Sequence, residues 1–517
     1  MQTNNRTMFG HYSVRLRVTL PLMALLAGSG PLLRTHAQQR ALAAETIKLD
    51  PTKNFGTWEG WGSSLAWWAR AIGGTANADY YADLIYTTKT TGSYPGLGLN
   101  IVRYNVGGGG IEQPKENKGP KLQWQMDIHG YWADPNSSDP ATWKWSADEN
   151  QRSMMQRARR RGANVFEMFS DSPMWWMNKN RSTAGSNTGG DCLMPENYDR
   201  FTFYLASVAR YSADHWGIKF DSVEPFNEPS ADWWKYPNRQ EGCHFEVATQ
   251  QKIVESLRRA LDREHLNDVA VGAADENNMD AGLKTWNAYE VGRSLIGLVN
   301  VHGYSNGTEP YQGPNRVELR HAVGNKRLWQ SEYGDGDASG YTMAQEIIRD
   351  VKELQPKAWV YWQPVEPDVP EYGWGLINAN YIDTHDQMSA EKTPLVRVNR
   401  KFYVYGQFTR YLRPGYQLIG IDETHSIAAY DHSSHKLVVV KVTSDAPETI
   451  KLGLSGFSEV GNTIEVIATT TAPGDAVPDW KQHLEKLKME NDGNLAITQS
   501  TLYPKSIYTF VIEAVLR

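Results

Sequence analysis

Two glutamates, Glu228 and Glu332, stand in short strings that suit cleavage of a glycosidic bond. Glu228 lies in Asn227-Glu228-Pro229 and Glu332 in Ser331-Glu332-Tyr333, each at the end of a β-rich run. A carboxyl held protonated can donate to the leaving oxygen, while a second, ionised carboxyl about 5 Å away can attack the anomeric carbon with net retention. The Asn227 amide could bind a sugar 2-hydroxyl. Because a single glutamate is more often a solvated charge, this interpretation depends on the elements that place the two together.

Eight short β-rich runs alternate with helical stretches between residues 55 and 405. The predicted strands are Gly62–Trp67, Gly98–Asn105, Asn164–Phe169, Ser222–Asn227, Val269–Ala274, Leu298–Gly303, Leu328–Ser331 and Trp359–Trp362. The predicted helices between them include Asn197–His215, Ala248–Leu266 and Thr342–Leu354. This order predicts an α/β fold, a (β/α)8 TIM barrel, whose strands open at one face. Glu228 and Glu332 end the fourth and seventh strands, so we expect them in one pocket there, beside a long loop at Val106–Ala163.

The pattern changes after residue 405 to β-branched, alternating runs separated by turn residues. Leu437–Thr443, Thr463–Ala468 and Ser506–Ile512 are the clearest of them. They predict an appended antiparallel β-sandwich domain over residues 406–517. The N-terminal segment 38–54 contains the strand-like run Glu45–Leu49, which we expect to pair with the sandwich. Such a domain could bind carbohydrate, but a structural module packed on the barrel is the favoured interpretation.

The composition excludes several classes of protein. The 517 residues carry a formal net charge of −6, which argues against a nucleic-acid partner. With 40% hydrophobic and 11% aromatic residues the chain is neither a multispanning membrane protein nor disordered. The 19 tryptophans could stack on sugars or fill cores. Gly107–Gly110 lacks the rest of a phosphate or dinucleotide loop, and no metal-ligand spacing occurs, so we expect no cofactor and no metal. We also expect a monomer.

The first residues are typical of a secretory signal peptide. Arg15 and Arg17 precede the apolar run Val18–Leu26, and Ala37 ends a cleavage-like string, so residues 1–37 are expected to be removed and the protein to be extracellular. The apolar run is too short to span a membrane. Export would make the sequons at Asn136, Asn180 and Asn306 candidate glycosylation sites. It would also favour a disulfide between the two cysteines, Cys192 and Cys243, over two buried free thiols.

Several longer strings resemble glycoside hydrolase family 30, and within it most closely the fungal endo-β-1,6-galactanases. The resemblance covers nearly the whole chain after residue 37. It rests on the strings at residues 55–68, 100–110, 226–229, 240–245 and 329–336. The two strings around the glutamates are specific to the wider clan. The tryptophan-rich opening and Glu241-Gly242-Cys243-His244-Phe245 are more specific to the galactanases.

The resemblance implies roles for particular residues. Glu228 would be the acid/base and Glu332 the nucleophile of a retaining, cofactor-free hydrolase. Tyr304 would face the acid/base and Trp362 would stack under the sugar in the cleavage subsite. The resemblance further implies substrate contacts in the pocket floor and after strand three, for Arg103, Asn105, and Trp175 or Trp176. For Trp68, as for Trp67 beside it, sugar contact and barrel packing are equally open, and for Arg103 an ion pair with a pocket carboxylate is compatible with substrate contact.

The implied substrate is a polysaccharide or oligosaccharide with internal β-1,6-galactosidic linkages, such as the galactan side chains of arabinogalactans. A β-1,6-glucanase, a glucosylceramidase-like enzyme or a xylanase of the same family is the alternative, because a fold does not determine the sugar. An alternative of another class is a non-catalytic carbohydrate-binding protein on an inactive barrel. The presence of both Glu228 and Glu332 in their strings argues against it.

Overall fold

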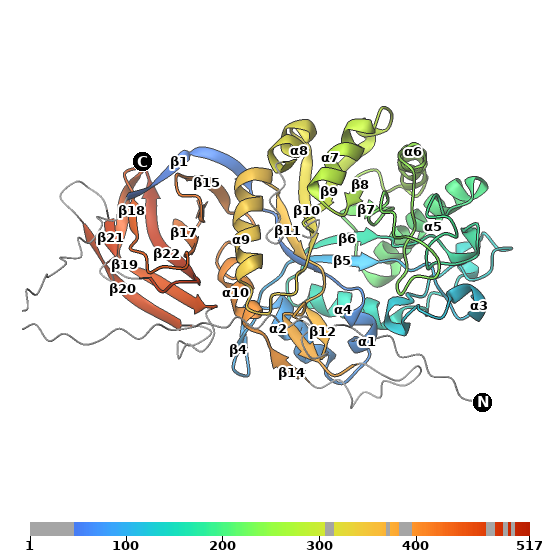
Figure 1. Ribbon diagram of the computed structural model, residues 1–517, viewed down its shortest axis with the longest axis horizontal. Helices are drawn as coiled ribbons and strands as arrows, with labels where there is room; N and C mark the ends of the chain where they lie inside the picture. Colours follow the sequence, from blue (N-terminus) through green and yellow to red (C-terminus); the bar gives the residue numbers. More distant parts are fainter. Residues whose placement is uncertain are drawn as a thin grey trace, which may run out of the picture. The chain divides into compact units, whose positions relative to one another are not determined.

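A closed ring of eight parallel strands forms the centre of the protein (Figure 1). The computed structural model describes residues 46–304, 315–368, 373–381, 395–471, 481–489, 495–497 and 502–517. The barrel strands, in chain order, are β2 (Gly60–Ser64), β5 (Ile101–Asn105), β6 (Val165–Phe169), β7 (Ser222–Glu224), β8 (Ala270–Glu276), β9 (Ile296–His302), β10 (Arg327–Tyr333) and β11 (Ala358–Tyr361). Each overlaps one of the eight predicted strands, and β11 pairs with β2 to close the ring. The predicted α/β barrel is confirmed.

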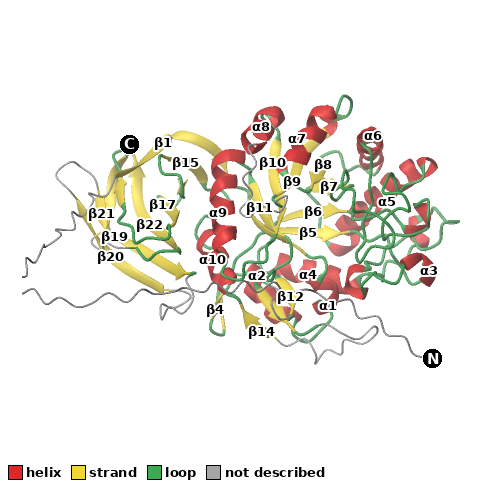
Figure 2. Cartoon of the chain, viewed as in Figure 1, coloured by secondary structure: helices red, strands yellow, loops and turns green. Residues whose placement is uncertain are grey.

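Helices cover the outside of the ring (Figure 2). They are α1 (Trp68–Ile72), α2 (Ala78–Tyr86), α4 (Glu149–Arg160), α5 (Tyr198–Tyr211), α6 (Val247–Arg263), α7 (Met279–Ala288), α8 (Asn315–Val323), α9 (Tyr341–Arg349) and α10 (Arg400–Thr409), with a short α3 (Lys115–Lys118) in a loop. On α6 the buried residues Ile253, Leu257 and Leu261 recur every four positions, which makes one apolar stripe facing the strands. The segment Val106–Ala163, which was expected to be a loop, contains the barrel helix α4 near its end.

Alternation along the barrel strands separates two kinds of side chain. On β5, Val102 and Tyr104 point outward into the core beneath the helices, whereas Ile101 packs inside the ring and Arg103 follows it two residues later on the same face. Apolar residues of this inner face, with Leu298 and Trp329, fill one end of the barrel. Polar residues fill the end toward which the strands run, and this end carries the chemistry.

Two β-bulges break this alternation at the functional end. The pairing of β10 with β9 shifts between Gln330 and Glu332. Adjacent residues of a regular strand face opposite sides, but here both Ser331 and Glu332 face inward. The pairing of β8 with β9 shifts between Ala274 and Glu276, at Asp275. A bulge adds one residue to a strand and changes the direction of the side chains that follow. Each bulge therefore adds an inward-facing carboxylate that strict alternation would not supply.

The second set of strands is antiparallel apart from one pair. β1 (Thr46–Thr57), β15 (Gln417–Ile421), β16 (Ser426–Asp431), β17 (Lys436–Val442), β22 (Ser506–Leu516), β19 (Phe457–Thr470) and β20 (Lys481–Met489) form one sheet. β18 (Lys451–Gly453) and β21 (Leu495–Ile497) complete a second sheet that shares β1 and β20 with the first. The two sheets therefore join at both edges around their own core, and β1 belongs to both.

Short strands complete the description of the chain. β3 (Thr90–Thr91) pairs with β4 (Tyr94–Pro95), and β12 (Val365–Pro367), β13 (Ile377–Ala379) and β14 (Leu395–Val398) form a small sheet after the last barrel strand.

The β-domain contacts helices of the barrel. Thr509 donates to the Gln407 carbonyl of α10 at 2.8 Å, and Lys352 donates to the Glu423 carbonyl at 2.7 Å. The described β-domain residues thus brace the barrel through its helices.

We expect the buried ion network between α8 and α9 to be essential for stability. Arg316 is fully buried, donates to Asp350 at 2.8 Å and pairs with Glu346. Arg316→Met leaves two buried carboxylates without this partner, so we expect the free energy of unfolding to fall by about 3–5 kcal/mol. The exposed pair Arg210–Asp214 provides the control, and Arg210→Met should cost less than about 1 kcal/mol. Equal denaturation midpoints for the two variants would contradict this.

Candidate active site

The two glutamates come together at the carboxyl end of the barrel. Glu332 lies in β10 and Glu228 four residues after β7, and both are buried, at 4% and 7% exposure. His302, the last residue of β9, lies between them, with Nδ1 3.4 Å from an oxygen of each. One oxygen of each carboxyl and one nitrogen of this histidine all lie within 4.8 Å of one another. Carboxyls this close suit nucleophilic attack by one of them, because activation of a water between them needs a wider gap.

Arg103 of β5 holds the nucleophile candidate in place. Its guanidinium donates to Glu332 Oε2 at 2.9 Å, to Asp275 at 2.6 Å and to Glu167 at 3.1 Å, and also to the Ser331 carbonyl at 3.0 Å. The side chain of Arg103 is fully buried. Arg103 therefore forms an ion pair with one pocket carboxylate, Glu332, and two more with Asp275 and Glu167, which do not line the cavity. Arg103 orients Glu332 from below and does not line the cavity itself.

Charges around Glu332 act on its ionisation in opposite directions. The pKa of Glu332 is raised to about 7, because its burial raises the pKa more than the charges of His302 and Arg103 lower it. Burial would by itself lower the pKa of His302, but Glu332 and Asp275 raise it well above its usual value. Arg103 and His302 outweigh the burial of Asp275 and hold its pKa at about 2. A protonated His302 thus stabilises the ionised form of Glu332. Both ring nitrogens of protonated His302 carry a hydrogen, so neither has a lone pair for a metal.

Two residues of this site have a strained backbone. Glu228 has a φ of 49° and Asp275 a φ of 56°, the left-handed region that side chains other than glycine rarely adopt. The Glu228 N–H donates to the Asp275 carbonyl at 2.8 Å, so the two strained residues support each other. Such residues cost about 1–3 kcal/mol each and persist where the surrounding fold fixes them. Here the strain places the Glu228 carboxyl over the barrel end.

Tyr304 lines the same cavity as both glutamates and bonds to the nucleophile candidate. Its hydroxyl donates to Glu332 Oε1 at 3.0 Å. The acid/base candidate instead accepts from Asn277 Nδ2 at 2.6 Å. The order of the strands explains both contacts. Tyr304 follows β9, the neighbour of β10, whereas Asn277 follows β8, the neighbour of β7.

A cavity of about 230 Å³ contains both carboxyls. Among the predicted residues, Asn227, Tyr304 and Trp362 line it with them, and so do Trp67, Trp233, Arg239, Gln240, Asn277, Glu366 and Trp374. Trp362 packs edge to face against Trp67, with ring centroids 5.0 Å apart. The Asn227 Oδ1 atom has no hydrogen-bond partner among the described residues. It is therefore available to a ligand hydroxyl.

Trp68 was the wrong choice within the predicted pair. It is the first residue of α1 and fully buried, and its Nε1 donates to the Ser64 carbonyl at 2.9 Å. Because the helix begins there, its ring turns into the layer between helices and strands. Trp67, one residue earlier, lines the cavity instead.

Three other predicted residues do not line the cavity. Asn105 is fully buried and donates to Asp171 at 2.7 Å, so it supports the floor. Trp176 is buried and donates to the Trp132 carbonyl at 2.9 Å, which identifies it as a packing residue. Trp175 is the more exposed of the two, but the cavity does not reach it.

The sequence reasoning missed several residues of the site. Gln240 was within a quoted string and His302 within a predicted strand, but neither had a role assigned. Asn277, Trp374 and Glu366 follow barrel strands five and eight, and this position was the only signal for them. Glu366 is nearly fully buried, and burial raises its pKa to about 8, so it is largely protonated at neutral pH.

Cys192 and Cys243 lie side by side as buried free thiols. The His244 N–H donates to Cys192 Sγ at 3.2 Å. The pKa of the Cys243 thiol is raised, mainly by its burial and next by the neighbouring Cys192. The structure thus lacks the predicted disulfide but brings its two partners together, and the bond stays a prediction.

The described sequons differ in access. Asn136 is exposed, while Asn180 is half-buried and its amide donates to the Gly185 carbonyl at 2.8 Å. Asn306 and the segment 1–37 lie outside the described residues. No helix within the described part of the chain is long and apolar enough to cross a membrane.

Comparison with known proteins agrees with this geometry. Residues 44–291 match the family model of O-glycosyl hydrolase family 30. The chain is 38% identical to an endo-β-1,6-galactanase of Hypocrea rufa over 89% of its own length and 92% of the relative. A conserved exported protein from Bacteroides fragilis (19% identity, TM-score 0.74) and the catalytic domain of xylanase C of this family from Talaromyces cellulolyticus (19%, 0.63) share the fold, each over 90% of this chain and all of the other.

The charge on His302 predicts a shift in the pH profile. Because attack needs ionised Glu332, kcat/KM should fall as the pH drops through the Glu332 pKa of about 7. His302→Gln removes a cation that lowers this pKa, so we expect the acidic limb to move to higher pH. His129→Gln is the control, since the pKa of His129 is about 4 and its ring is neutral at working pH. An acidic limb in His302→Gln that stays in place or moves to lower pH would contradict this.

Proposed function

The chain belongs to O-glycosyl hydrolase family 30, and we propose that this glycoside hydrolase cleaves internal β-1,6-galactosidic linkages, such as those in the side chains of arabinogalactans. The observation that carries the chemistry is the pair of buried carboxyls whose nearest oxygens lie within 4.8 Å. The 38% identity to an endo-β-1,6-galactanase supports the choice of sugar and linkage.

In the first half of the reaction Glu332 attacks the anomeric carbon while Glu228 gives its proton to the leaving oxygen. Arg103 and Tyr304 each hold one oxygen of Glu332, and Asn277 holds Glu228. Trp362 offers a flat face to the sugar, and Asn227 Oδ1 accepts from its 2-hydroxyl. In the second half Glu228 takes a proton from a water whose oxygen attacks the anomeric carbon. The bond from this carbon to Glu332 breaks, and the sugar leaves with its β configuration retained.

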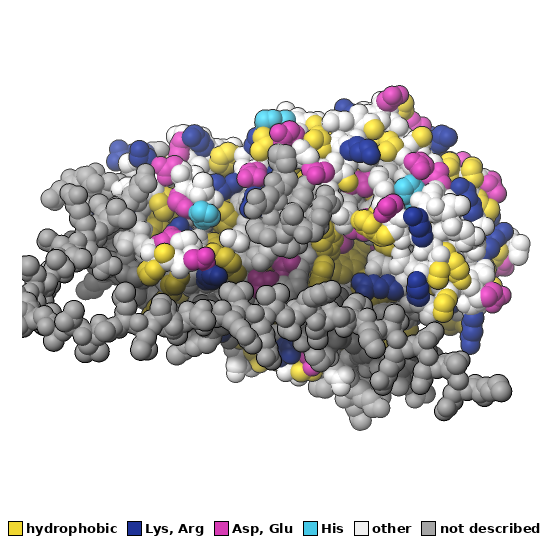
Figure 3. Space-filling view, viewed as in Figure 1, with side chains coloured by type: hydrophobic (Ala, Val, Ile, Leu, Met, Phe, Trp, Pro, Cys, Tyr) yellow, Lys and Arg dark blue, Asp and Glu magenta, His cyan; other side chains and the backbone are white. Residues whose placement is uncertain are grey.

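The shape of the site favours attack within a chain. A second cavity, of about 540 Å³, shares Glu228, Trp233, Arg239 and Gln240 with the first. Figure 3 shows a hollow among hydrophobic side chains, with lysine or arginine side chains near its edge. Space on both sides of the acid/base accommodates sugars before and after the cleaved bond.

The remaining sequence interpretations stay part of this proposal. Residues 1–37 act as a secretory signal, residues 55–405 form the catalytic domain, and residues 406–517 with segment 38–54 form the β-domain. The secreted protein is a monomer. It carries a disulfide bond between Cys192 and Cys243, because adjacent thiols are oxidised in an oxidising compartment. Asn136 is the better glycosylation site of the two described sequons, because its side chain is exposed.

A panel of defined oligosaccharides tests the sugar and linkage. We expect β-1,6-galacto-oligosaccharides to be cut at internal bonds, with higher kcat/KM than β-1,6-gluco- or β-1,4-xylo-oligosaccharides of equal length. Preference for glucose would identify the β-1,6-glucanase alternative, and preference for xylose the xylanase. Binding without any cleavage would leave the carbohydrate-binding alternative.

Azide distinguishes the roles of the two glutamates. In Glu332→Ala azide should attack in place of the carboxylate and give an α-galactosyl azide from an activated aryl galactoside. In Glu228→Ala the covalent intermediate still forms, and azide should displace Glu332 to give the β-azide. Loss of acid/base help should slow galactan by about 10²- to 10⁴-fold, and the aryl substrate far less. Anomers of the opposite kind would reverse the assignment, and Glu318→Ala, an exposed residue of α8, is the control.

A further inference from the structure

The larger cavity lies on the leaving-group side of the acid/base. Glu228 and Trp233 line it, but Glu332 does not. In a double displacement the acid/base stands between the sugar that becomes attached to the nucleophile and the group that departs. A space that touches the acid/base and not the nucleophile is therefore where the departing part of the substrate lies. This assignment rests on the proposed function.

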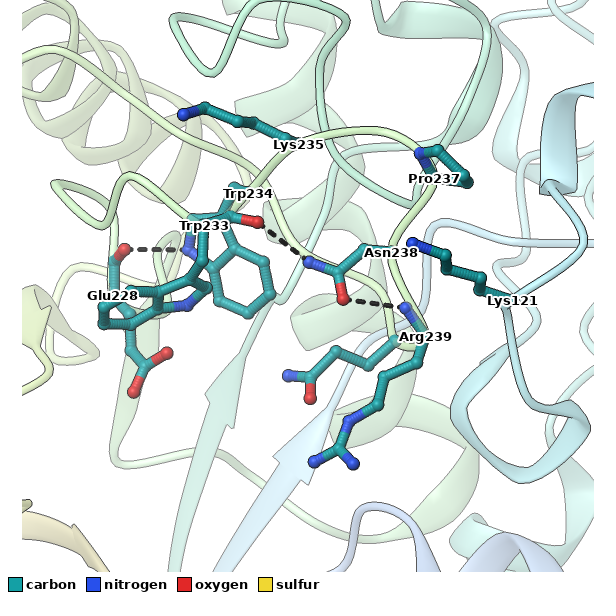
Figure 4. A pocket seen from close by; sticks show the side chains of 9 residues that line it. Lys121, Glu228, Trp233, Trp234, Lys235, Pro237, Asn238 and Arg239 are labelled. Atoms are coloured by element: carbon teal, nitrogen blue, oxygen red, sulfur yellow. Dashed lines mark hydrogen bonds between the residues drawn. The ribbon is translucent and has the colours of Figure 1, made fainter. Parts of the chain in front are cut away.

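Two neighbouring tryptophans give this cavity a fixed wall and an open platform. Trp234 is buried, and its Nε1 donates to the Glu228 carbonyl at 2.9 Å, which ties the loop to the acid/base. Trp233 is 46% exposed, with its ring centroid 6.2 Å from that of Trp234. Figure 4 shows both rings between Glu228 and the rest of the lining. An exposed, rigid indole in this place suits the apolar face of a sugar.

Three cations line the same cavity, and the charge of one of them, Arg239, also lowers the pKa of Glu366 in the smaller cavity. Lys121, Lys235 and Arg239 are exposed, and none forms an ion pair with a residue that the structure describes. Among the described residues of this lining, Glu228 is the one acid. The whole chain carries a net charge of −6, so this local positive charge is contrary to the overall balance. Cations gathered in a cleft raise the local concentration of an anionic ligand.

Contacts between two loops put these cations in place. The Gln123 N–H donates to the Arg239 carbonyl at 3.0 Å. This bond joins the segment of Lys121, which follows β5, to the loop that follows β7. The Arg239 N–H donates to Asn238 Oδ1 at 2.7 Å. In Figure 4 the Arg239 guanidinium and the Glu228 carboxyl lie on the same side of the loop. The Lys121 ammonium points toward Asn238, and Lys235 lies beyond the two tryptophans.

We propose that this cavity is a leaving-group subsite that selects a saccharide carrying a carboxylate. The planar guanidinium of Arg239 matches a carboxylate in shape and can donate two parallel hydrogen bonds to it. Lys121 and Lys235 add positive potential around it, and Trp233 supports the sugar ring. Because all three cations are exposed to solvent, salt screens their effect.

A matched pair of substrates isolates the carboxylate. β-1,6-Galactotetraose oxidised at its reducing end to galactonate differs from the same sugar reduced to galactitol in one charged group at the leaving end. We expect kcat/KM for release of that end to be roughly three- to tenfold higher for the galactonate at low ionic strength, the size expected for a few exposed ion pairs. The ratio should approach one in about 0.5 M salt.

Charge-removing variants connect the ratio to the cavity. Arg239→Gln should lower the galactonate-to-galactitol ratio most, and the triple variant with Lys121→Gln and Lys235→Gln should bring it close to one. Lys89→Gln, an exposed lysine outside both cavities, should keep the wild-type ratio. A wild-type ratio of one at low salt, or an unchanged ratio in the triple variant, would overturn the subsite. Cleavage of both substrates at equal rates overturns only the subsite, whereas cleavage of neither overturns the proposed function as well.

Discussion

The buried guanidinium of Arg103 is the interaction on which the active site depends. It joins β5 to carboxylates from β6, β8 and β10, and it is fully buried. A charge removed from water at such cost is stable only where its donors are satisfied, so the arrangement around it tolerates little displacement. Glu332 consequently has one oxygen fixed by Arg103, and the other accepts the Tyr304 hydroxyl. The proposed nucleophile is thus held in one orientation by both contacts.

This arrangement requires the barrel to depart from regular strand geometry. Strict alternation would let either Ser331 or Glu332 face inward, but the bulge in β10 lets both do so, and Ser331 then binds Asp275 at 2.6 Å. The bulge in β8 and the left-handed backbone of Asp275 and Glu228 act in the same way across the ring. The rigid eight-stranded ring maintains this strain, and the strain brings the two glutamates together.

The sequence was most informative about features that depend on period and order. Alternating strands and helices predict the barrel, and because strand ends meet at one face, Glu228 and Glu332 were expected together, with Asn227 beside Glu228. The family resemblance added Trp362, and all four residues line one cavity. Side-chain direction at element ends was not predictable in this way. One residue at the start of α1 decides between Trp67 and Trp68, and a bulge in β10 decides which side chains face inward. The loop residues Trp233 and Arg239 have no periodic pattern, so only the folded loops place them.

Trapping the covalent intermediate tests the central claim, that the Arg103 network prepares Glu332 as the nucleophile. A 2-deoxy-2-fluoro-β-galactoside with a good leaving group should inactivate the enzyme, because the fluorine slows the second step more than the activated first one. Peptide mass spectrometry should then find one fluorogalactosyl group on the peptide that contains Glu332. A label on the Glu228 peptide, or full turnover with no labelled peptide, would contradict the account.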